Sequence, residues 1–334
     1  MRKVSLTGIQ ATGVPHLGNY IGAIRPALEL AAEYDAHYFI ADYHSLNSLR
    51  EPEKLAHYTR AVAASWLAAG LDADQITFYR QSDVPETFEL SWILSCVTGK
   101  GLMNRAHSYK AARDRNTEAG ADPDNGVNMG LFNYPVLMAA DILIMAADVV
   151  PVGKDQAQHL EYTADIAGSF NHLFGARYSF PVPQAILPEA TTGAVLPGLD
   201  GRKMSKSYDN TIPLFLPQSQ LKKLVRRIPT DSTPVEAPKD PDGSFVFQIL
   251  EQFASPSVTA DTRKRLEAGG MGWGDLKNVL FETLDEQFGP MRERYEELMA
   301  EGSELESVLK AGAEKARGRA REVLANVRHA VGVS

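Results

Sequence analysis

The sequence of 334 residues contains a single cysteine, Cys96. One thiol excludes a disulfide within the chain and any zinc or iron–sulfur site built from several cysteines. Cys96 falls in the apolar stretch 90–97, which predicts a buried and unreactive thiol.

A long uninterrupted apolar segment is also missing. The most apolar region, 134–152, contains Asp141, Asp148 and two prolines, which makes it a poor membrane span. The N-terminus, Met1-Arg2-Lys3, does not lead into the apolar segment of a signal peptide. We therefore expect a cytoplasmic protein without a membrane partner.

The sequence lacks an excess of positive charge as well, since its net charge is −8. Phosphate contacts dominate nucleic-acid affinity, so this charge is unfavourable for a nucleic-acid binder, but a local basic face would suffice. No DNA partner is expected. Two clusters are candidates for such a face, and on these residues alone a solvated helix surface is the favoured interpretation. The candidates are Lys222, Lys223, Arg226, Arg227, Arg317, Arg319, Arg321 and Arg328.

Short β-type runs alternate with helical patterns through the first half of the chain. This alternation predicts an α/β fold, with a parallel sheet covered by helices on both faces. The strands are expected at 4–6, 37–41, 76–80 and 149–152, and the helices at 17–34, 53–69 and 85–98. Pro26 should kink or restart the first of these helices.

The second half is predicted to be helical. Residues 276–298 and 305–331 have helical apolar spacing, with a bend expected at Gly289-Pro290. The polar stretches 111–127 and 229–244 are expected to be exposed loops. We therefore predict a nucleotide-binding domain at 1–216, with an insertion around 100–140, and a helical domain at 217–334.

Two short strings fit the binding of a triphosphate. The glycine-containing turn after the first strand, 7–13, lets backbone N–H groups approach an anion, and His16 and Gly18 follow at the start of a helix. Lys203-Met204-Ser205-Lys206-Ser207 carries two ammonium groups on a loop that can follow departing pyrophosphate. Taken singly, each string is more often a plain connection or a solvated turn.

Together, the strings at 15–19 and 203–207 resemble the two signature motifs of class I aminoacyl-tRNA synthetases. Gly153-Lys154-Asp155-Gln156 followed by His159 is similar to a segment shared by the tryptophanyl and tyrosyl branches. Tyr134, Met138 and Asp141 resemble the amino-acid pocket of the tryptophanyl branch, in which the tyrosyl branch has glutamine at the position of Met138. The resemblance extends to 312–316 near the C-terminus.

The resemblance implies a Rossmann-like catalytic domain that activates L-tryptophan with ATP and Mg²⁺ and transfers it to tRNA(Trp). It also implies a homodimer with tRNA spanning both subunits, to which the apolar segments 92–97 and 132–145 are candidate contributors. It assigns catalysis to His16, Asn19, Lys203, Ser205 and Lys206. It assigns ATP binding to Gln10, Ala11, Thr12, Gly18, Asn19, Gly153, Lys154, Asp155, Val195, Lys203, Met204, Ser205, Lys206 and Ser207. Tryptophan binding falls to His44, Tyr134, Met138, Asp141 and Gln156, and pyrophosphate contact to Lys110. No residue is assigned to a dedicated metal site.

The pocket residues also make chemical sense by themselves. An indole N–H is only a donor, and a buried carboxylate at Asp141 would accept it. Such a bond rejects analogues that lack the N–H.

Three alternative functions remain open. They are a tyrosyl-tRNA synthetase, a small nucleotidyltransferase, and a catalytically silent paralogue that binds tryptophan or tRNA.

Overall fold

The computed structural model describes residues 2–152, 157–186 and 195–333. Its centre is a parallel five-stranded sheet in the order β3-β2-β1-β4-β5. Strands β1 and β2 are paired along their whole length, with Leu6 opposite His37, and β1 meets β4 at Ser5 and Val149. The strands are β1 (Val4–Gln10), β2 (Asp35–Ala41), β3 (Thr77–Arg80), β4 (Val149–Pro151) and β5 (Gln184–Ile186). The four predicted strands are therefore confirmed, and β5 was missed.

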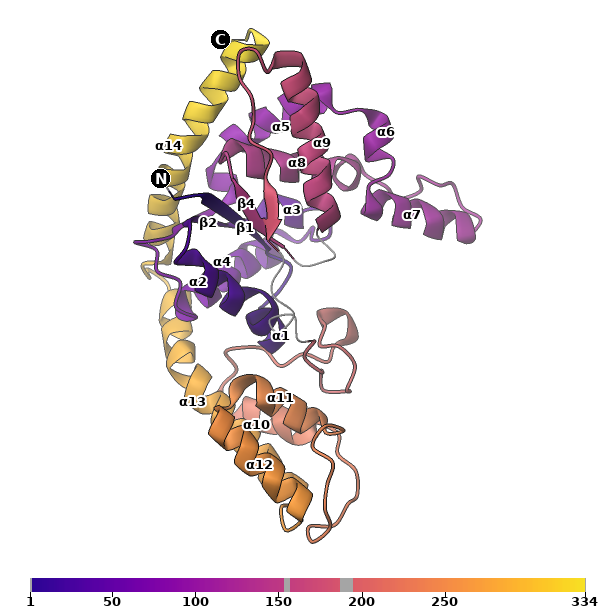
Figure 1. The fold of residues 1–334 in the computed structure, drawn as a ribbon, viewed down its shortest axis with the longest axis vertical. Helices are drawn as coiled ribbons and strands as arrows, with labels where there is room; N and C mark the ends of the chain where they lie inside the picture. The colour runs from indigo at the N-terminus through magenta and orange to yellow at the C-terminus, as the bar shows by residue number, and fades with distance from the viewer. Residues whose placement is uncertain (1, 153–156, 187–194, 334) are drawn as a thin grey trace.

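Helices cover both faces of this sheet (Figure 1), as predicted. Apolar side chains alternate along β2, so that Tyr38 and Ile40 face one core while Phe39 and Ala41 face the other. The helical elements of this first half of the chain are α1 (Leu17–Asn19), η1 (Tyr20–Ile24), α2 (Arg25–Ala31), α3 (Asp42–Ser45), α4 (Pro52–Ala68), η2 (Gln81–Asp83), α5 (Glu86–Val97), α6 (Lys100–Met103), α7 (His107–Glu118), α8 (Met129–Ile144) and α9 (Ala157–Phe174).

Pro26 has the predicted effect on the first helical segment. The chain forms a π-helical turn at η1 and restarts as α2, with Pro26 in its first turn. Proline is tolerated there because the first helical N–H groups have no intrahelical partner.

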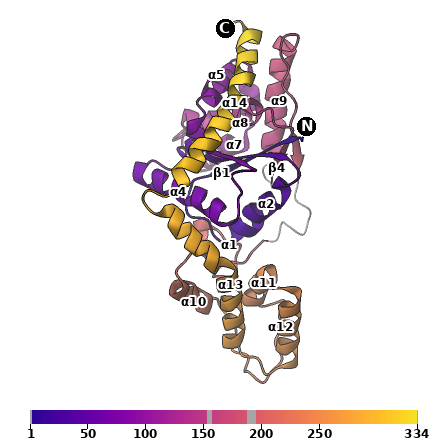
Figure 2. The same cartoon turned by 90° about the vertical axis from the view of Figure 1, so that its left-hand side faces the viewer.

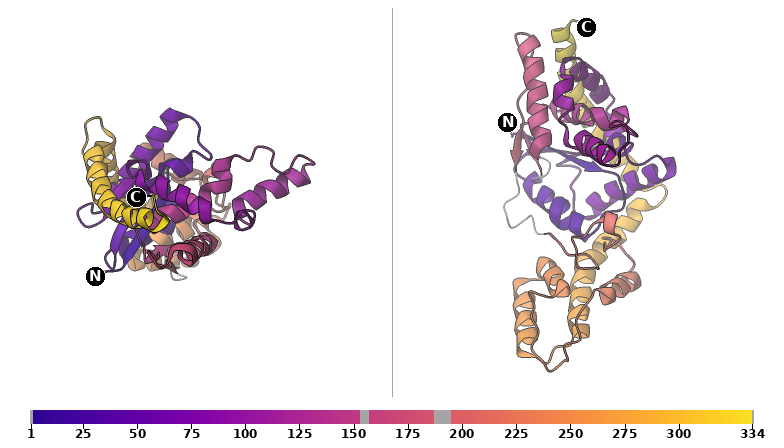
Figure 3. Two further views of the ribbon diagram at one scale, coloured as in Figure 1. Left: turned by 90° about the horizontal axis from the view of Figure 1, so that it is seen from above. Right: turned by 90° about the vertical axis from the view of Figure 1, so that its right-hand side faces the viewer.

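The expected loop at 111–127 is wrong in its first part, because α7 continues to Glu118. Residues 111–115 are Ala-Ala-Arg-Asp-Arg, which has no glycine or proline to stop a helix. Only Tyr109 and Ala112 of α7 are buried, and the helix projects from the body of the molecule (Figure 3). Its polar composition therefore reflects solvent on most sides rather than a loop.

Cys96 is exposed, which corrects the prediction of a buried thiol. It lies one turn after Trp92 on the outer side of α5, while Leu90 and Leu94 of the same helix are buried. The apolar stretch 90–97 thus has more apolar residues than its buried face can accommodate.

The helical half begins after residue 216 and packs in two places. Helices α10 to α12 and the first part of α13 form a separate layer below the sheet, whereas α14 returns along β3 and α5 (Figures 1 and 2). Helix α13 continues through Pro290 without a break. The elements are η4 (Lys206–Tyr208), α10 (Gln218–Arg227), α11 (Phe245–Phe253), α12 (Pro256–Ala268), α13 (Trp273–Met299) and α14 (Leu305–Val331).

The four arginines of α14 that were candidates for a basic face all pair with groups of the same chain. Arg317 and Arg321 both donate to the carboxylate of Glu86, which is only 9% exposed. Arg328 pairs with Glu89 on the same neighbouring helix. These ion pairs attach α14 to α5, whereas the basic residues of α10 are exposed and form no ion pair with another described residue.

Candidate active site

A cavity of about 900 Å³ opens at the carboxyl ends of the central strands, where ligands bind in open parallel sheets. Thr7, Gly8 and Gln10 line it from the end of β1, and His44 lines it from α3. Tyr134, Met138 and Asp141 contribute from α8, because their spacing of four and three places them on one helix face. Four of the five residues predicted to bind tryptophan therefore share one cavity. The fifth, Gln156, lies outside the described residues.

Asp141 is the buried acid of this cavity, with 4% of its surface exposed. Its Oδ2 lies 2.9 Å from Nε2 of His44, and Nε2 of Gln81 lies 2.9 Å from Oδ1 and 3.0 Å from Oδ2. Burial raises the pKa of Asp141, while the hydrogen bonds from His44 and Gln81 act in the opposite direction. Gln81 was missed by the sequence analysis, although its position directly after a strand is a signal that could have indicated it.

Tyr134 presents its hydroxyl to the same cavity. Ser108 at the start of α7 donates to Oη of Tyr134 over 3.2 Å, and Nε2 of His159 lies 3.1 Å from that oxygen. Burial raises the pKa of Tyr134, so the phenol stays neutral at physiological pH. Ser108 lines the cavity itself and was also missed by the sequence analysis.

The turn after β1 is held against the chain that follows the 203–207 loop. The N–H of Leu17 donates to the carbonyl of Ile212 over 2.9 Å, and the N–H of Leu214 donates to the carbonyl of Pro15 over 3.1 Å. His16 begins helix α1, and its N–H donates to Oδ1 of Asn19. Tertiary pairing therefore brings the two motifs together although they are far apart in the sequence.

Lys206 and His16 are the two basic groups on the facing sides of this junction. A methyl group on Gly13 would lie 3.0 Å from Nζ of Lys206, and Gly13 has a φ of +148°. Burial, and secondarily the charge of Lys206, lowers the pKa of His16 to about 4. Loss of hydration lowers the pKa of Lys206 itself. A methyl group on Gly18 would lie 3.0 Å from the His16 ring, so a larger residue at position 18 would crowd the imidazole.

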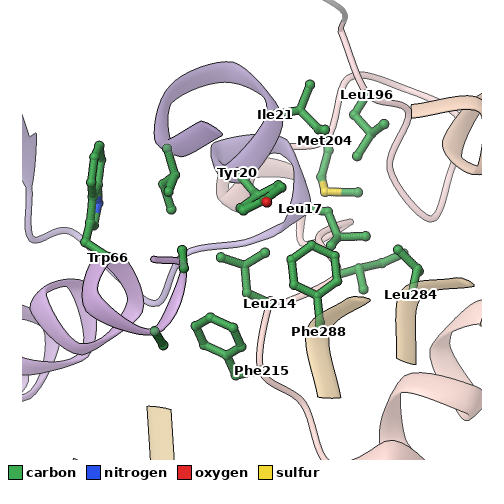
Figure 4. Close-up of a cluster of buried hydrophobic side chains, with 14 of the residues drawn as sticks. Leu17, Tyr20, Ile21, Trp66, Leu196, Met204, Leu214, Phe215, Leu284 and Phe288 are labelled. Carbon is green, nitrogen blue, oxygen red and sulfur yellow. The ribbon is translucent and has the colours of Figure 1, made fainter. Parts of the chain in front are cut away.

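Asn210 holds the 203–207 loop in shape. Its Oδ1 accepts the N–H of Ser205 over 2.8 Å, and its Nδ2 donates to Asp200 over 2.6 Å and to the carbonyl of Lys203 over 3.1 Å. Met204 anchors the loop by packing its side chain in the core with Leu17 (Figure 4). Its side chain is therefore turned into the core, while Lys203 and Ser207 are exposed.

Other predicted residues lie away from the cavity wall or outside the described ranges. Lys110 is exposed on α7 and does not line the cavity, and Val195 is 64% exposed. Gly153, Lys154 and Asp155 are among the residues that the structure does not describe.

Two further findings concern the described residues alone. None of their helices combines the length and apolar character needed to cross a bilayer. They also contain no group of three histidine, cysteine or acidic residues that could hold a metal ion.

Comparisons with known proteins give the family. The model of a protein family described as "tRNA synthetases class I (W and Y)" matches residues 2–289 of this chain. The tryptophan--tRNA ligase of Pseudomonas aeruginosa is 54% identical over 98% of this chain and 73% of its own length. That of Xanthomonas axonopodis pv. citri is 53% identical over 98% of this chain and 76% of its own.

Solved structures agree with this result. Tryptophanyl-tRNA synthetase from Campylobacter jejuni, complexed with ADP and tryptophan, superposes with a TM-score of 0.89 at 42% identity, covering 98% of this chain and 99% of that one. The Mycoplasma pneumoniae structure gives 0.77 at 30% identity, covering 100% and 99%. The chain therefore belongs to the class I tRNA synthetases of the tryptophan and tyrosine type, and within them to the tryptophan--tRNA ligases.

Proposed function

We propose that the cavity beside α8 binds L-tryptophan and that the turn after β1 and the 203–207 loop hold ATP during adenylate formation. The overall reaction is that of the family: tryptophan is activated by ATP and transferred to tRNA(Trp). The observation that carries the proposal is the buried carboxylate of Asp141 on the wall of a 900 Å³ cavity at the carboxyl edge of the sheet. In an apolar setting, that acid selects a ligand with a hydrogen-bond donor.

Each tryptophan-binding residue has a distinct task in this proposal. Asp141 accepts the indole N–H, and Met138 packs its thioether against the ring. Tyr134 and Gln156 hold the α-amino and carboxylate groups. His44 donates to Asp141 and lines the cavity beside it, which is supported by the 2.9 Å distance between them.

The phosphate-binding residues act through charge and position. The tryptophan carboxylate attacks the α-phosphorus in line, and pyrophosphate leaves. Because this nucleophile is already ionised at neutral pH, no general base is required. His16 stays neutral and donates a hydrogen bond, while Lys203 and Lys206 neutralise the charge that builds on the departing phosphates. Gln10, Ala11, Thr12, Gly18, Asn19, Ser205 and Ser207 complete the ATP site.

Magnesium enters this proposal with ATP. The basic side chains at the junction of the two motifs, His16, Lys203 and Lys206, offer only nitrogen atoms, whereas Mg²⁺ prefers oxygen ligands. The ion would therefore be held mainly by phosphate oxygens and water and would neutralise phosphate charge. His16, Lys203 and Lys206 supply the protein's own contacts to those phosphates.

Helix α10 is the proposed tRNA-binding face of the helical region, and tRNA charging would take place in the cytoplasm. Lys222, Lys223, Arg226 and Arg227 are all exposed, while Leu221 and Val225 attach the helix to the core beneath. Their four charges offer contacts to phosphates despite the net negative charge of the chain.

We also propose a homodimer that uses the outer side of α5. Trp92 is 73% exposed there, and Cys96 is exposed one turn later. A large exposed aromatic residue is typical of interface anchors. The second candidate segment, 132–145, contributes less, because most of its residues are buried in the core of the same chain.

ATP–pyrophosphate exchange with Asp141→Asn tests the assignment of the cavity. The expected result is a rise in the KM for tryptophan of at least about a hundredfold, with the KM for ATP within twofold. Asp165→Asn, an exposed acid on α9, serves as the control. An unchanged KM for tryptophan would remove Asp141 from the site. Exchange dependent on tyrosine, or binding without exchange, would favour the alternative functions.

A further inference from the structure

Gln81 lies next to Asp141 and has no role in the mechanism proposed above. It begins the short helical turn η2 directly after β3 and is 1% exposed. Its side chain does not line the cavity, but its Nε2 lies within 3.0 Å of both oxygens of Asp141. Its own Oε1 is buried without a hydrogen-bond partner among the described residues.

The unpaired Oε1 indicates what holds Gln81 in place. An unsatisfied buried amide oxygen is costly, and the same side chain would avoid that cost if it turned towards solvent. Among the described residues, the Gln81 side chain forms hydrogen bonds to Asp141 alone. The amide is therefore oriented by the carboxylate, and the carboxylate by the amide.

The number of donors around Asp141 shows which oxygen remains open. Oδ2 receives two hydrogen bonds, from His44 and Gln81, whereas Oδ1 receives one, from Gln81. A carboxylate accepts about four hydrogen bonds, two at each oxygen. The remaining acceptor position therefore lies on Oδ1.

We propose that Gln81 is a specificity-determining positioning residue: it holds the Asp141 carboxylate so that Oδ1 faces the cavity and accepts the indole N–H. This inference rests on the proposed role of Asp141. Gln81 does not touch the substrate, so it acts only through the acid. Its loss should therefore weaken binding of ligands that carry the N–H and leave ligands without it nearly unaffected.

The charge of Asp141 provides a second readout. Burial raises the pKa of this acid, and the nearby charge of Asp42 acts in the same direction, while His44 and Gln81 oppose both. Tyr79 is the other titratable group facing it, and burial keeps that phenol neutral. Removing the Gln81 bond removes one of the contacts that favour the ionised form. The acid limb of kcat/KM for tryptophan should then move to higher pH.

The experiment compares tryptophan with 3-(benzothiophen-3-yl)alanine, in which sulfur replaces the indole N–H. Gln81→Met keeps the side-chain length and removes the amide. We expect kcat/KM for tryptophan in pyrophosphate exchange to fall about tenfold or more, while that for the analogue stays within twofold. Gln75→Met, at an exposed position before β3, is the matched control and should change neither value.

The deciding quantity is the ratio of kcat/KM for tryptophan to kcat/KM for the analogue. If Gln81→Met lowers both values equally, or lowers neither, this ratio is unchanged and the inference is overturned. Asp141→Asn, measured in parallel, separates the two proposals. If Asp141→Asn leaves the ratio unchanged, the proposed role of Asp141 fails. If Asp141→Asn lowers the ratio and Gln81→Met does not, only the proposed role of Gln81 fails. Gln81→Asn keeps an amide that is one methylene shorter and replaces the methionine variant if that variant does not fold. Its ratio should lie below that of the wild type, and an unchanged ratio with full tryptophan affinity overturns the inference.

Discussion

The ammonium group of Lys206 lies so close to the backbone of Gly13 that a methyl group added to Gly13 would come within 3.0 Å of it. Gly13 belongs to the turn after the first strand, and Lys206 belongs to the loop at 203–207. The two strings that are proposed to bind ATP therefore meet in the structure. Their junction provides the first tests of the mechanism.

Lys206→Ala should slow tryptophan-dependent pyrophosphate exchange about a hundredfold in kcat. The ammonium group is proposed to stabilise charge that develops on the leaving phosphates, so its value is largest in the transition state. The KM for tryptophan should change by less than about threefold. Lys264→Ala, an exposed lysine on α12, is the control. Unchanged exchange would contradict the role of Lys206.

Gly13→Ala should raise the KM for ATP and lower the rate of pyrophosphate exchange. The new methyl group displaces Lys206, and an alanine at position 13 must adopt a φ of +148°. Tryptophan binding, measured by calorimetry without ATP, should be retained. Gly168→Ala is the matched control, since open space surrounds that glycine within α9. The control should stabilise the protein by up to about 1 kcal/mol. A Gly13→Ala enzyme with normal kinetics would show that this approach is not functional.

His16 should make the protein less stable in acid. Its folded pKa is about 4, whereas the unfolded value is near 6.5, so the unfolded chain binds the extra proton between these values. The free energy of unfolding therefore falls as pH decreases through this window. Urea unfolding at pH 7 and pH 5 should show a loss that is smaller in His16→Gln by on the order of 1 kcal/mol. His57→Gln, at an exposed position, should match the wild type.

Substitutions in the basic clusters of α10 and α14 should have different effects, on tRNA affinity for α10 and on stability for α14. Arg226→Gln, on the exposed face of α10, should weaken tRNA binding and reduce the slope of log K against log salt by about one, without changing Tm. Arg317→Gln breaks the ion pair with the buried Glu86 and should destabilise the protein by about 1–3 kcal/mol while tRNA affinity stays constant. Filter binding across a salt series and thermal unfolding measure the two effects. Loss of tRNA affinity in Arg317→Gln without destabilisation would reverse the assignment.

Trp92→Glu should convert the proposed dimer to a monomer in sedimentation velocity. A buried charge at the centre of an apolar interface lacks a partner and is costly. Leu173→Glu replaces another exposed apolar residue, on α9, and should leave the oligomeric state unchanged. A Trp92→Glu protein that sediments like the wild type would show that α5 does not form the interface.

Local patterns determined much of the fold. The alternation of apolar runs and helical spacing predicted four of the five strands and the helix at 305–331, because burial of one face is already encoded in the order of the side chains. Strand β5 is as short as β4, but its residues are Gln-Ala-Ile and none of them is buried, so it lacks the apolar run that indicated β4. Polar composition was misleading at α7, where most of the helix is solvated.

The types of residue in the site were also present in the sequence, but their partners were not. Only tertiary packing places Gln81 beside Asp141, attaches Arg317 to Glu86 and leaves Cys96 exposed. A side chain's burial and hydrogen bonds depend on which distant segment covers it, and local spacing contains no such information. The sequence by itself therefore determined which chemical groups this protein has, and the folded chain decided which of them meet.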